Sequence, residues 1–168
     1  MAKDKEAAGN AQQQSMNFET RKVYLKDASF EAPSTPHVFT QTDLKPKIDV
    51  QVLVEYRILD KEEGMTEIVL KVTVTAKHEE NVLYLAEVHQ AGLFKVQHPD
   101  EEMRKVVTEV TCPHILLPFA REELNNLISK GGFGSFLMAP VNFETIYRNK
   151  VEKDMDQAAT TDSPKTMN

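Results

Sequence analysis

Apolar and polar residues alternate with a period of two through most of the stretch 48–96. Apolar side chains occupy the even positions of two runs, 48–58 and 68–76, and the even positions 84, 86, 88, 94 and 96 of a third run. Such alternation gives a strand one apolar and one mixed face. The polar links between the runs are short enough for hairpins. The pattern therefore predicts three consecutive antiparallel strands, and the rest of the chain must cover their apolar face.

An earlier strand is predicted at 21–27. Its apolar parity changes at Ala28 and Phe30, so we expect a bulge or bend near Asp27. The proline-bearing segment 31–47 is typical of an irregular crossover. A long crossover followed by three hairpin-linked strands favours a Greek-key-like order.

The apolar spacing becomes helical beyond residue 100. Asp100 suits an N-cap position, and Glu101 and Glu102 suit the positive end of a helix. The apolar stripe that follows, together with the apolar strand face, exceeds what one small sheet needs to cover. We therefore expect oligomer contacts at Ala86, Val88, Met103, Val106, Val107 and Val110.

Two prolines interrupt the helical region. Pro113 and Pro118 predict a kink or break where the first stripe ends. A second stripe, within 116–128, ends at Gly131-Gly132 in the position of a C-terminal cap. A third helical stretch is predicted from Asn142.

The two ends of the chain are polar. Residues 1–17 and 152–168 offer too little apolar surface to bury, so we expect disordered tails there. Residues 18–151 then form a single domain. At 168 residues and 40% apolar composition the chain supports one core.

The composition excludes several classes of protein. A net charge of −6 without a basic cluster argues against nucleic-acid binding. The first 17 residues lack the apolar block of a signal peptide, and no apolar run is long enough to span a bilayer. A single cysteine, Cys112, cannot form an intrachain disulfide. We expect a soluble cytoplasmic protein without direct membrane insertion.

No motif in the sequence points to catalysis, a cofactor or a metal. The glycine cluster at 131–135 lacks the Gly-Lys-Ser/Thr ending of a phosphate loop and is typical of a helix–helix hinge. Cys112 and His114 are too few for a metal site and point in different directions on a helix. The remaining histidines are scattered and form no ligand pattern. We expect no enzyme.

Two surfaces leave a choice between structure and binding. Glu87 shares its strand face with Leu83, Leu85 and His89, which suits either a solvated sheet face or a docking patch. The apolar segments 44–52 and 133–147 flank proline- or glycine-bearing connectors. Core packing is their default interpretation, and the alternative is a groove for unspecific apolar side chains.

Six segments, in order along the chain, resemble the SecB family of protein-export chaperones. They are VYLKDASFEAP at 23–33, PHVF at 36–39, VTVTA at 72–76, EVHQAGLF at 87–94, CPHILLPFAR at 112–121 and APVNF at 139–143. The resemblance implies an α+β fold, a four-stranded antiparallel sheet covered by C-terminal helices, assembled as a homotetramer. Leu44 stands where the family usually carries tryptophan.

The resemblance also implies a function and its sites. The family holds secretory precursors unfolded without ATP and passes them to the translocase ATPase SecA. Its SecA-docking positions fall on Asp27, Glu31, Leu85 and Glu87. Its client groove maps to Leu44, Ile48, Val50, Val52, Phe143, Ile146 and Tyr147.

Two other functions remain open at this point. A SecB-like chaperone could serve one dedicated client, such as an antitoxin. A helix-on-sheet thioesterase of the hot-dog type is the enzymatic alternative. That fold threads its central helix before most strands, whereas here the helices follow the sheet.

Overall fold

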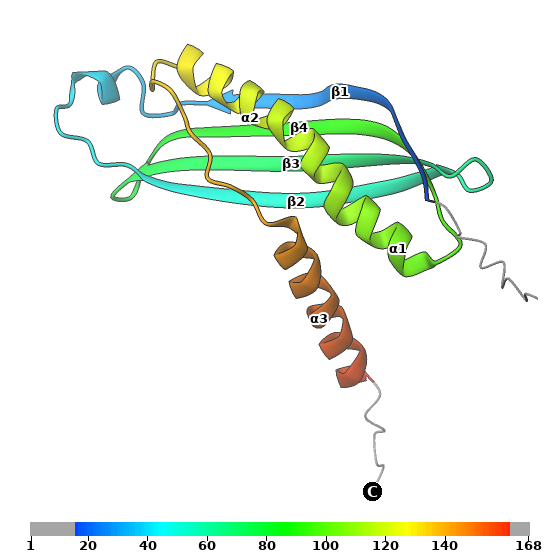
Figure 1. Cartoon of the computed structure of the whole chain (residues 1–168). Coiled ribbons are helices and arrows are strands. Elements are labelled where there is room, and N and C mark those ends of the chain that lie inside the picture. The colour runs from blue at the N-terminus through cyan, green and yellow to red at the C-terminus, as the bar shows by residue number, and fades with distance from the viewer. Residues whose placement is uncertain (1–15, 162–168) are drawn as a thin grey trace, which may run out of the picture.

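Four long strands form one antiparallel sheet in the computed structural model, which describes residues 16–161 and side chains as far as residue 155. The strands are β1 (Asn17–Glu31), β2 (Lys47–Asp60), β3 (Met65–His78) and β4 (Asn81–Gln97). Their order across the sheet is β1-β4-β3-β2, so β1 lies beside the last strand of a three-stranded meander (Figure 1). This arrangement confirms the predicted α+β fold and Greek-key-like order.

One continuous helical rod covers one face of the sheet (Figure 1). It comprises α1 (Glu101–Val106), the π-helical turn η2 (Val107–Thr111) and α2 (Cys112–Lys130). Asp100 caps it, because its Oδ1 accepts a hydrogen bond from the N–H of Glu102 at 2.9 Å. The predicted N-cap is therefore confirmed.

The rod does not break where the prolines predicted a kink or break, but its helix type changes there. The π-helical turn η2 ends just before α2, and Pro113 is the second residue of α2, so the wider turn lies where the proline has no N–H to donate. Pro118 lies inside α2 without ending it. Leu116, Leu117 and Ala120 on either side are buried against the sheet, and this packing outweighs one lost hydrogen bond.

The core lies between the rod and the even-numbered face of β3 and β4. Its fully buried large side chains include Ile68, Leu70, Val72, Val74, Val88, Phe94, Leu116, Leu124 and Ile128. Ala86, Val88, Val107 and Val110 are also buried there, so they cannot supply the oligomer contacts predicted for them. The sheet needs these side chains for its own helical cover. Met103 stays exposed and Val106 is partly buried.

The bulge predicted near Asp27 is confirmed. Leu25 lies opposite Gln90, whereas Asp27 lies opposite His89, so the register of β1 against β4 slips by one residue between them. A slip of one residue exchanges the two faces of a strand. After the bulge Ala28 and Phe30 face the helices, and the acidic residues of β1 face the open side.

The C-terminal part of the chain follows the prediction, except that the last helix is longer than expected. The predicted C-terminal cap of α2 is confirmed, because Gly132 has a φ of 86° and the N–H of Phe133 bonds the carbonyl of Ile128. The third helix, α3, spans Phe143–Thr161 and so continues into the segment 152–168, where we predicted disorder. Asn17 likewise belongs to β1. Residues 1–15 and 162–168 lie outside the described part of the chain.

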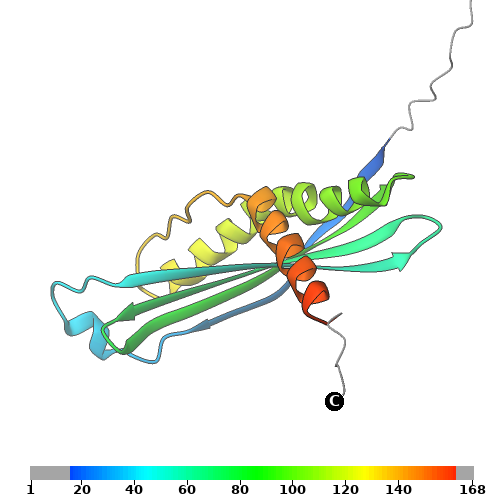
Figure 2. The same ribbon diagram turned by 90° about the horizontal axis from the view of Figure 1, so that it is seen from below.

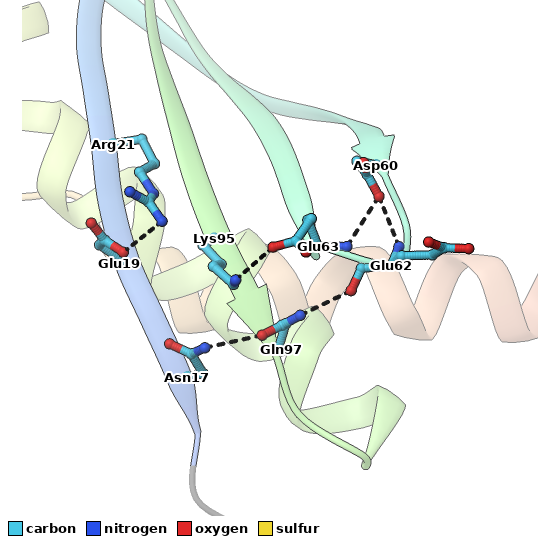
Figure 3. A network of polar contacts seen from close by, with 8 residues as sticks. All are labelled: Asn17, Glu19, Arg21, Asp60, Glu62, Glu63, Lys95 and Gln97. Atoms are coloured by element: carbon cyan, nitrogen blue, oxygen red, sulfur yellow. Dashed lines mark hydrogen bonds and ion pairs between the residues drawn. The ribbon is translucent and has the colours of Figure 1, made fainter.

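Polar contacts tie the strand ends together at one end of the sheet (Figure 3). Asn17 Nδ2 donates to Gln97 Oε1, and Gln97 Nε2 donates to the carbonyl of Glu62, both at 3.0 Å. Asp60 Oδ1 accepts hydrogen bonds from the N–H groups of Glu62 and Glu63. These contacts join the start of β1 and the end of β4 to the β2–β3 hairpin.

The open face of the sheet is held by a carboxylate with only 9% of its side chain exposed, that of Glu67 on β3. Lys26 of β1 reaches it at 2.8 Å and Arg57 of β2 at 3.3 Å. The hydroxyl of Tyr24 donates a further hydrogen bond to it. The hydrogen bonds from Lys26 and Tyr24 lower the pKa of Glu67, so the carboxylate stays ionised.

We predict that Glu67→Gln destabilises the fold by about 2 kcal/mol near neutral pH, the loss of hydrogen bonds to a charged group. The pKa of Glu67 is lowered in the folded state. Its contribution to stability is therefore complete at pH values above the ordinary carboxyl pKa, and it is lost as the pH falls through the pKa of the folded state. The difference between wild type and variant should therefore shrink below about pH 4. Urea unfolding followed by circular dichroism measures it. Glu63→Gln, which removes an exposed ion pair with Lys95, is the control. A difference in unfolding free energy between wild type and Glu67→Gln that is the same near neutral pH and below about pH 4 would contradict the prediction.

Candidate binding surfaces

The edge strand β2 lies largely outside the helical cover. The rod packs α2 against β4, β3 and β1, whereas β2 meets chiefly the short turn η2. Of the even-numbered side chains of β2, Val54 is buried beneath this turn. The others remain partly or largely exposed on the helical side: Ile48, Val50, Val52, Tyr56 and Ile58. Ile58 is the most exposed of the five, with 51% of its surface accessible to solvent. β2 therefore presents an apolar strip, the β2 strip, formed by these five residues.

The helix α3 starts beside β2 and then points away from the sheet (Figures 1 and 2). Three contacts fasten its first turns. Phe143 is fully buried, with its ring 4.8 Å edge-on from His114. Tyr147 donates to Glu102 Oε1 at 2.7 Å, and this bond raises the pKa of Tyr147 to about 12. Lys150 Nζ lies 2.7 Å from Glu109 Oε2 in η2.

Two hollows adjoin the β2 strip. One of about 410 Å³ lies between β2 and α3 and is lined by Val52, Ile146 and Tyr147 among others. The second, of about 480 Å³, lies farther along the strand, where Tyr56 and Ile58 face α1. Together they make a discontinuous groove along the helical side of β2.

The structure brings together most of the residues predicted for the client groove. Val52, Ile146 and Tyr147 share one hollow, and Ile48 and Val50 lie exposed on the same strand. Leu44 packs against the core from the crossover and is partly buried. Phe143 does not belong to the surface, because it anchors α3 in the core.

An aromatic cluster that the sequence patterns missed lies where the crossover meets the connector after α2. Phe39 of η1 (His37–Thr40) lies 5.2 Å from Phe133, and Phe133 lies 4.8 Å from Tyr84 of β4, measured between ring centroids. Phe39 is 53% exposed, and Leu137 on the connector is 95% exposed. The sequence feature that could have indicated this cluster is the presence of large apolar residues inside proline- and glycine-bearing connectors.

The four residues predicted to dock a partner do lie on one face. Glu31 pairs with Leu85 in the β1–β4 register, and Asp27 pairs with His89, two residues from Glu87. All project from the side of the sheet opposite the rod. We call this set, Asp27, Glu31, Leu85 and Glu87, the acidic face.

Hydrogen bonds fix the position of Glu87 within the acidic face. Thr73 donates to its Oε2 at 2.8 Å and lowers the pKa of Glu87, and a contact of 2.9 Å from His89 Nε2 to Oε1 acts in the same direction. His89 Nδ1 lies 3.9 Å from Asp27 Oδ2. The donor atoms of Asp27, Glu87 and His89 all lie within 4.8 Å of one another, close enough to approach one cation. The sequence pattern placed His89 on the strand face of Glu87 but did not show its approach to Asp27, because that depends on the register of β1.

None of the helices within residues 16–161 is long and apolar enough to cross a bilayer. The buried thiol of Cys112 has a pKa raised to about 12 by desolvation, which keeps it protonated and unreactive at neutral pH.

A comparison with known proteins agrees with this architecture. The structure of a Mycobacterium tuberculosis SecB-like chaperone in complex with a ChAD peptide from the HigA1 antitoxin has a similar fold, with a TM-score of 0.62. The match covers 74% of this chain and 90% of that one at 13% identity, so it is a likeness of fold.

The sequence comparisons are more specific. The SecB family model, described as preprotein translocase subunit SecB, matches residues 11–154. The protein-export protein SecB of Hydrogenovibrio crunogenus is 41% identical over 143 residues, which cover 85% of this chain and 94% of that protein. The SecB of Methylococcus capsulatus is 40% identical over 148 residues, covering 88% and 93%. The chain therefore belongs to the SecB family of protein-export chaperones.

Proposed function

We propose that this chain acts in the cytoplasm as an ATP-independent chaperone, which holds secretory precursors unfolded and delivers them to the ATPase SecA. The observation that carries the proposal is the β2 strip, an apolar surface along an edge strand that the helices of the described residues leave largely uncovered. An unfolded precursor exposes apolar segments of many sequences. A binding surface for them needs apolar walls and few specific contacts.

The strip suits an extended client in two ways. Covering its apolar side chains is worth about 25 cal/mol for each Å² removed from water. In addition β2 is an edge of the sheet, and an extended segment can pair with an exposed edge through main-chain hydrogen bonds, whatever its sequence. Side-chain contacts and main-chain pairing together would give affinity without strict specificity.

The aromatic cluster extends the proposed client surface. Phe39 and Leu137 expose apolar area at the end of the sheet where β2 begins, so one long client could contact both regions. Ordering an unfolded client costs several kcal/mol, so one such surface should bind weakly.

Assembly as a homotetramer, which we also propose, would raise the overall affinity through local concentration. In support, Leu25 of β1 and Phe119 of α2 are each about half exposed and line one shallow hollow, and Met103 is exposed on α1. In this proposal Leu25 and Phe119 join Met103 at the oligomer interface, in place of the buried residues Ala86, Val88, Val107 and Val110. Light scattering on purified protein tests the tetramer.

The acidic face is the proposed docking surface for SecA. Its carboxylates would attract a basic segment of the partner, and contacts between exposed charges weaken as salt rises. The face lies on the other side of the sheet from the β2 strip, so client and partner could bind at the same time.

A chaperone dedicated to one client, such as an antitoxin, is the second candidate. The structure of the M. tuberculosis SecB-like chaperone is a complex with an antitoxin peptide, and its fold is similar. Identification of the proteins that copurify with this chain separates the two candidates, since the precursor chaperone should capture many different secretory proteins.

We predict that wild-type protein, without nucleotide, slows the refolding of a chemically unfolded precursor, and that Val50→Ser weakens precursor binding roughly five-fold. The loss corresponds to about 1 kcal/mol for partial burial of one valine. Gln51→Ser is the matched control, because Gln51 is the next residue of β2 and faces the other side. Refolding kinetics at several chaperone concentrations give the apparent affinities. Equal affinities of wild type and Val50→Ser, with both folded, would rule out the β2 strip as the client surface.

We further predict that Glu87→Lys weakens SecA binding roughly ten-fold at low salt, because a charge reversal replaces attraction by repulsion. Wild-type affinity should fall as salt is added. Titration calorimetry with purified SecA measures both effects. Glu19→Lys makes the same charge change on β1, near the other end of the strand from Glu31, and should bind almost as wild type does. Insensitivity to both Glu87→Lys and salt would leave the acidic face as no more than a solvated sheet surface.

A further inference from the structure

A buried carboxylate lines the hollow between β2 and α3. Glu109 lies in η2, the helical turn that contacts both β2 and α3, and only 9% of its side chain is exposed. It shares the hollow of about 410 Å³ with apolar residues of both neighbours, among them Val52 and Ile146. A covered carboxylate is costly unless an opposite charge or hydrogen-bond donors satisfy it. The hollow therefore offers a strong site for a cation.

The chain itself supplies a cation to this site. Lys150 of α3 places its Nζ 2.7 Å from Glu109 Oε2. The same Nζ lies over the Tyr56 ring, 6.0 Å from its centroid, at the outer limit of the range in which an ammonium group and an aromatic face attract each other. Among the side chains that the structure describes, no other lysine, arginine or histidine nitrogen lies within 4 Å of this carboxylate. Glu109 and Tyr56 thus form a cation site, and the ammonium group of Lys150 occupies it.

Lys150 approaches the cation site from the solvent side. Its side chain is 46% exposed, and it belongs to a helix that points away from the sheet beyond its first turns (Figure 2). Tyr56 is a member of the β2 strip, so an extended segment that lies along the strip passes the cation site. A lysine or arginine of such a segment could replace Lys150, because both side chains combine an apolar stem with a cationic end.

We propose that Glu109 and Tyr56 form a subsite for a basic side chain of the client, and that Lys150 is an intramolecular competitor for this subsite. In the free chain Lys150 satisfies the carboxylate and fastens α3 beside β2. A client lysine or arginine takes over the contact, so the surface binds preferentially those apolar segments that carry a positive charge. Because Lys150 competes, the apparent affinity is reduced to the extent that the site is occupied in the free chain. This inference rests on the proposed role of the β2 strip in client binding.

The first test compares two extended apolar peptides with blocked ends, which carry either lysine or Nε-acetyl-lysine at one central position. Both side chains have the same apolar stem, but only lysine is charged. Wild type should bind the lysine peptide roughly three- to ten-fold more tightly, because a contact between charged groups is gained while the contact with Lys150 is lost. Glu109→Gln should bind both peptides alike. Fluorescence anisotropy with labelled peptides gives the affinities.

Glu144→Gln is the matched control for this test. It removes one negative charge from an exposed position in the first turn of α3. The variant should keep the preference of wild type for the lysine peptide. This control separates the cation site from the general attraction between a basic peptide and a chain with a net charge of −6.

The second test removes the competitor. Lys150→Met leaves the carboxylate without its cation, so the preference for the lysine peptide over the acetylated one should rise roughly three-fold or more above that of wild type. Lys153→Met makes the same charge change in the same hollow without removing the ion pair of Glu109, and its preference should stay close to that of wild type. Circular dichroism establishes that each variant is folded. Should Glu109→Gln fail to fold, the preference of Lys150→Met decides.

The outcomes separate this inference from the proposed function. Equal binding of both peptides by wild type would overturn the cation subsite and leave the β2 strip as the proposed client surface. The subsite would also be overturned by an unchanged preference in folded Glu109→Gln, or by the absence of a rise in Lys150→Met. Failure of wild type to bind either peptide would contradict the client surface itself, and this inference with it.

Discussion

One helical rod is the only large cover that the described chain provides for its sheet, and it reaches the fourth strand, β2, chiefly through its short turn η2. The α2 helix packs on β4, β3 and β1, while β2 lies outside it and keeps an exposed apolar strip. In an ordinary enzyme domain such a strip would be a liability for aggregation. In the function proposed here, this strip is the surface that binds unfolded clients. The same one-sided cover forces the opposite face to satisfy its own polar groups, and Glu67 does so by joining Lys26 of β1 and Arg57 of β2 across the sheet.

A bulge of one residue in β1 determines what the opposite face can do. Because the register slips between Leu25 and Asp27, the strand turns apolar side chains toward the rod on both sides of the slip. The acidic residues that follow, Asp27 and Glu31, are turned outward beside β4, where they meet Glu87 and His89. Without the slip, Asp27 would face the core, and a buried carboxylate without a partner would be costly. The fold and the acidic face thus depend on the same local irregularity.

Local patterns in the sequence predicted most of this fold, and contacts between distant segments account for what they missed. Period-two alternation located the strands, the change of parity at Ala28 located the bulge, and Asp100 located the start of the rod. The kink or break expected near Pro113 proved to be a π-helical turn within a continuous rod. Ala86, Val88, Val107 and Val110 were assigned to an oligomer interface, since an apolar pattern does not reveal whether its own chain or another one covers it. Two contacts were missed. The approach of His89 to Asp27 depends on the register of β1, and the contact of Phe39 with Phe133 depends on the path of two connectors.

The central claim is that unfolded chains bind along the helical side of β2. Site-specific photo-crosslinking tests it most directly, with a photoreactive phenylalanine analogue placed at Val50 in one protein and at Gln51 in another. These neighbours project from opposite faces of the same strand, and both are exposed at nearly the same distance from the strand end. We expect an unfolded precursor to crosslink strongly from position 50 and weakly from position 51. Equal yields from both positions, or a higher yield from position 51, would contradict the account.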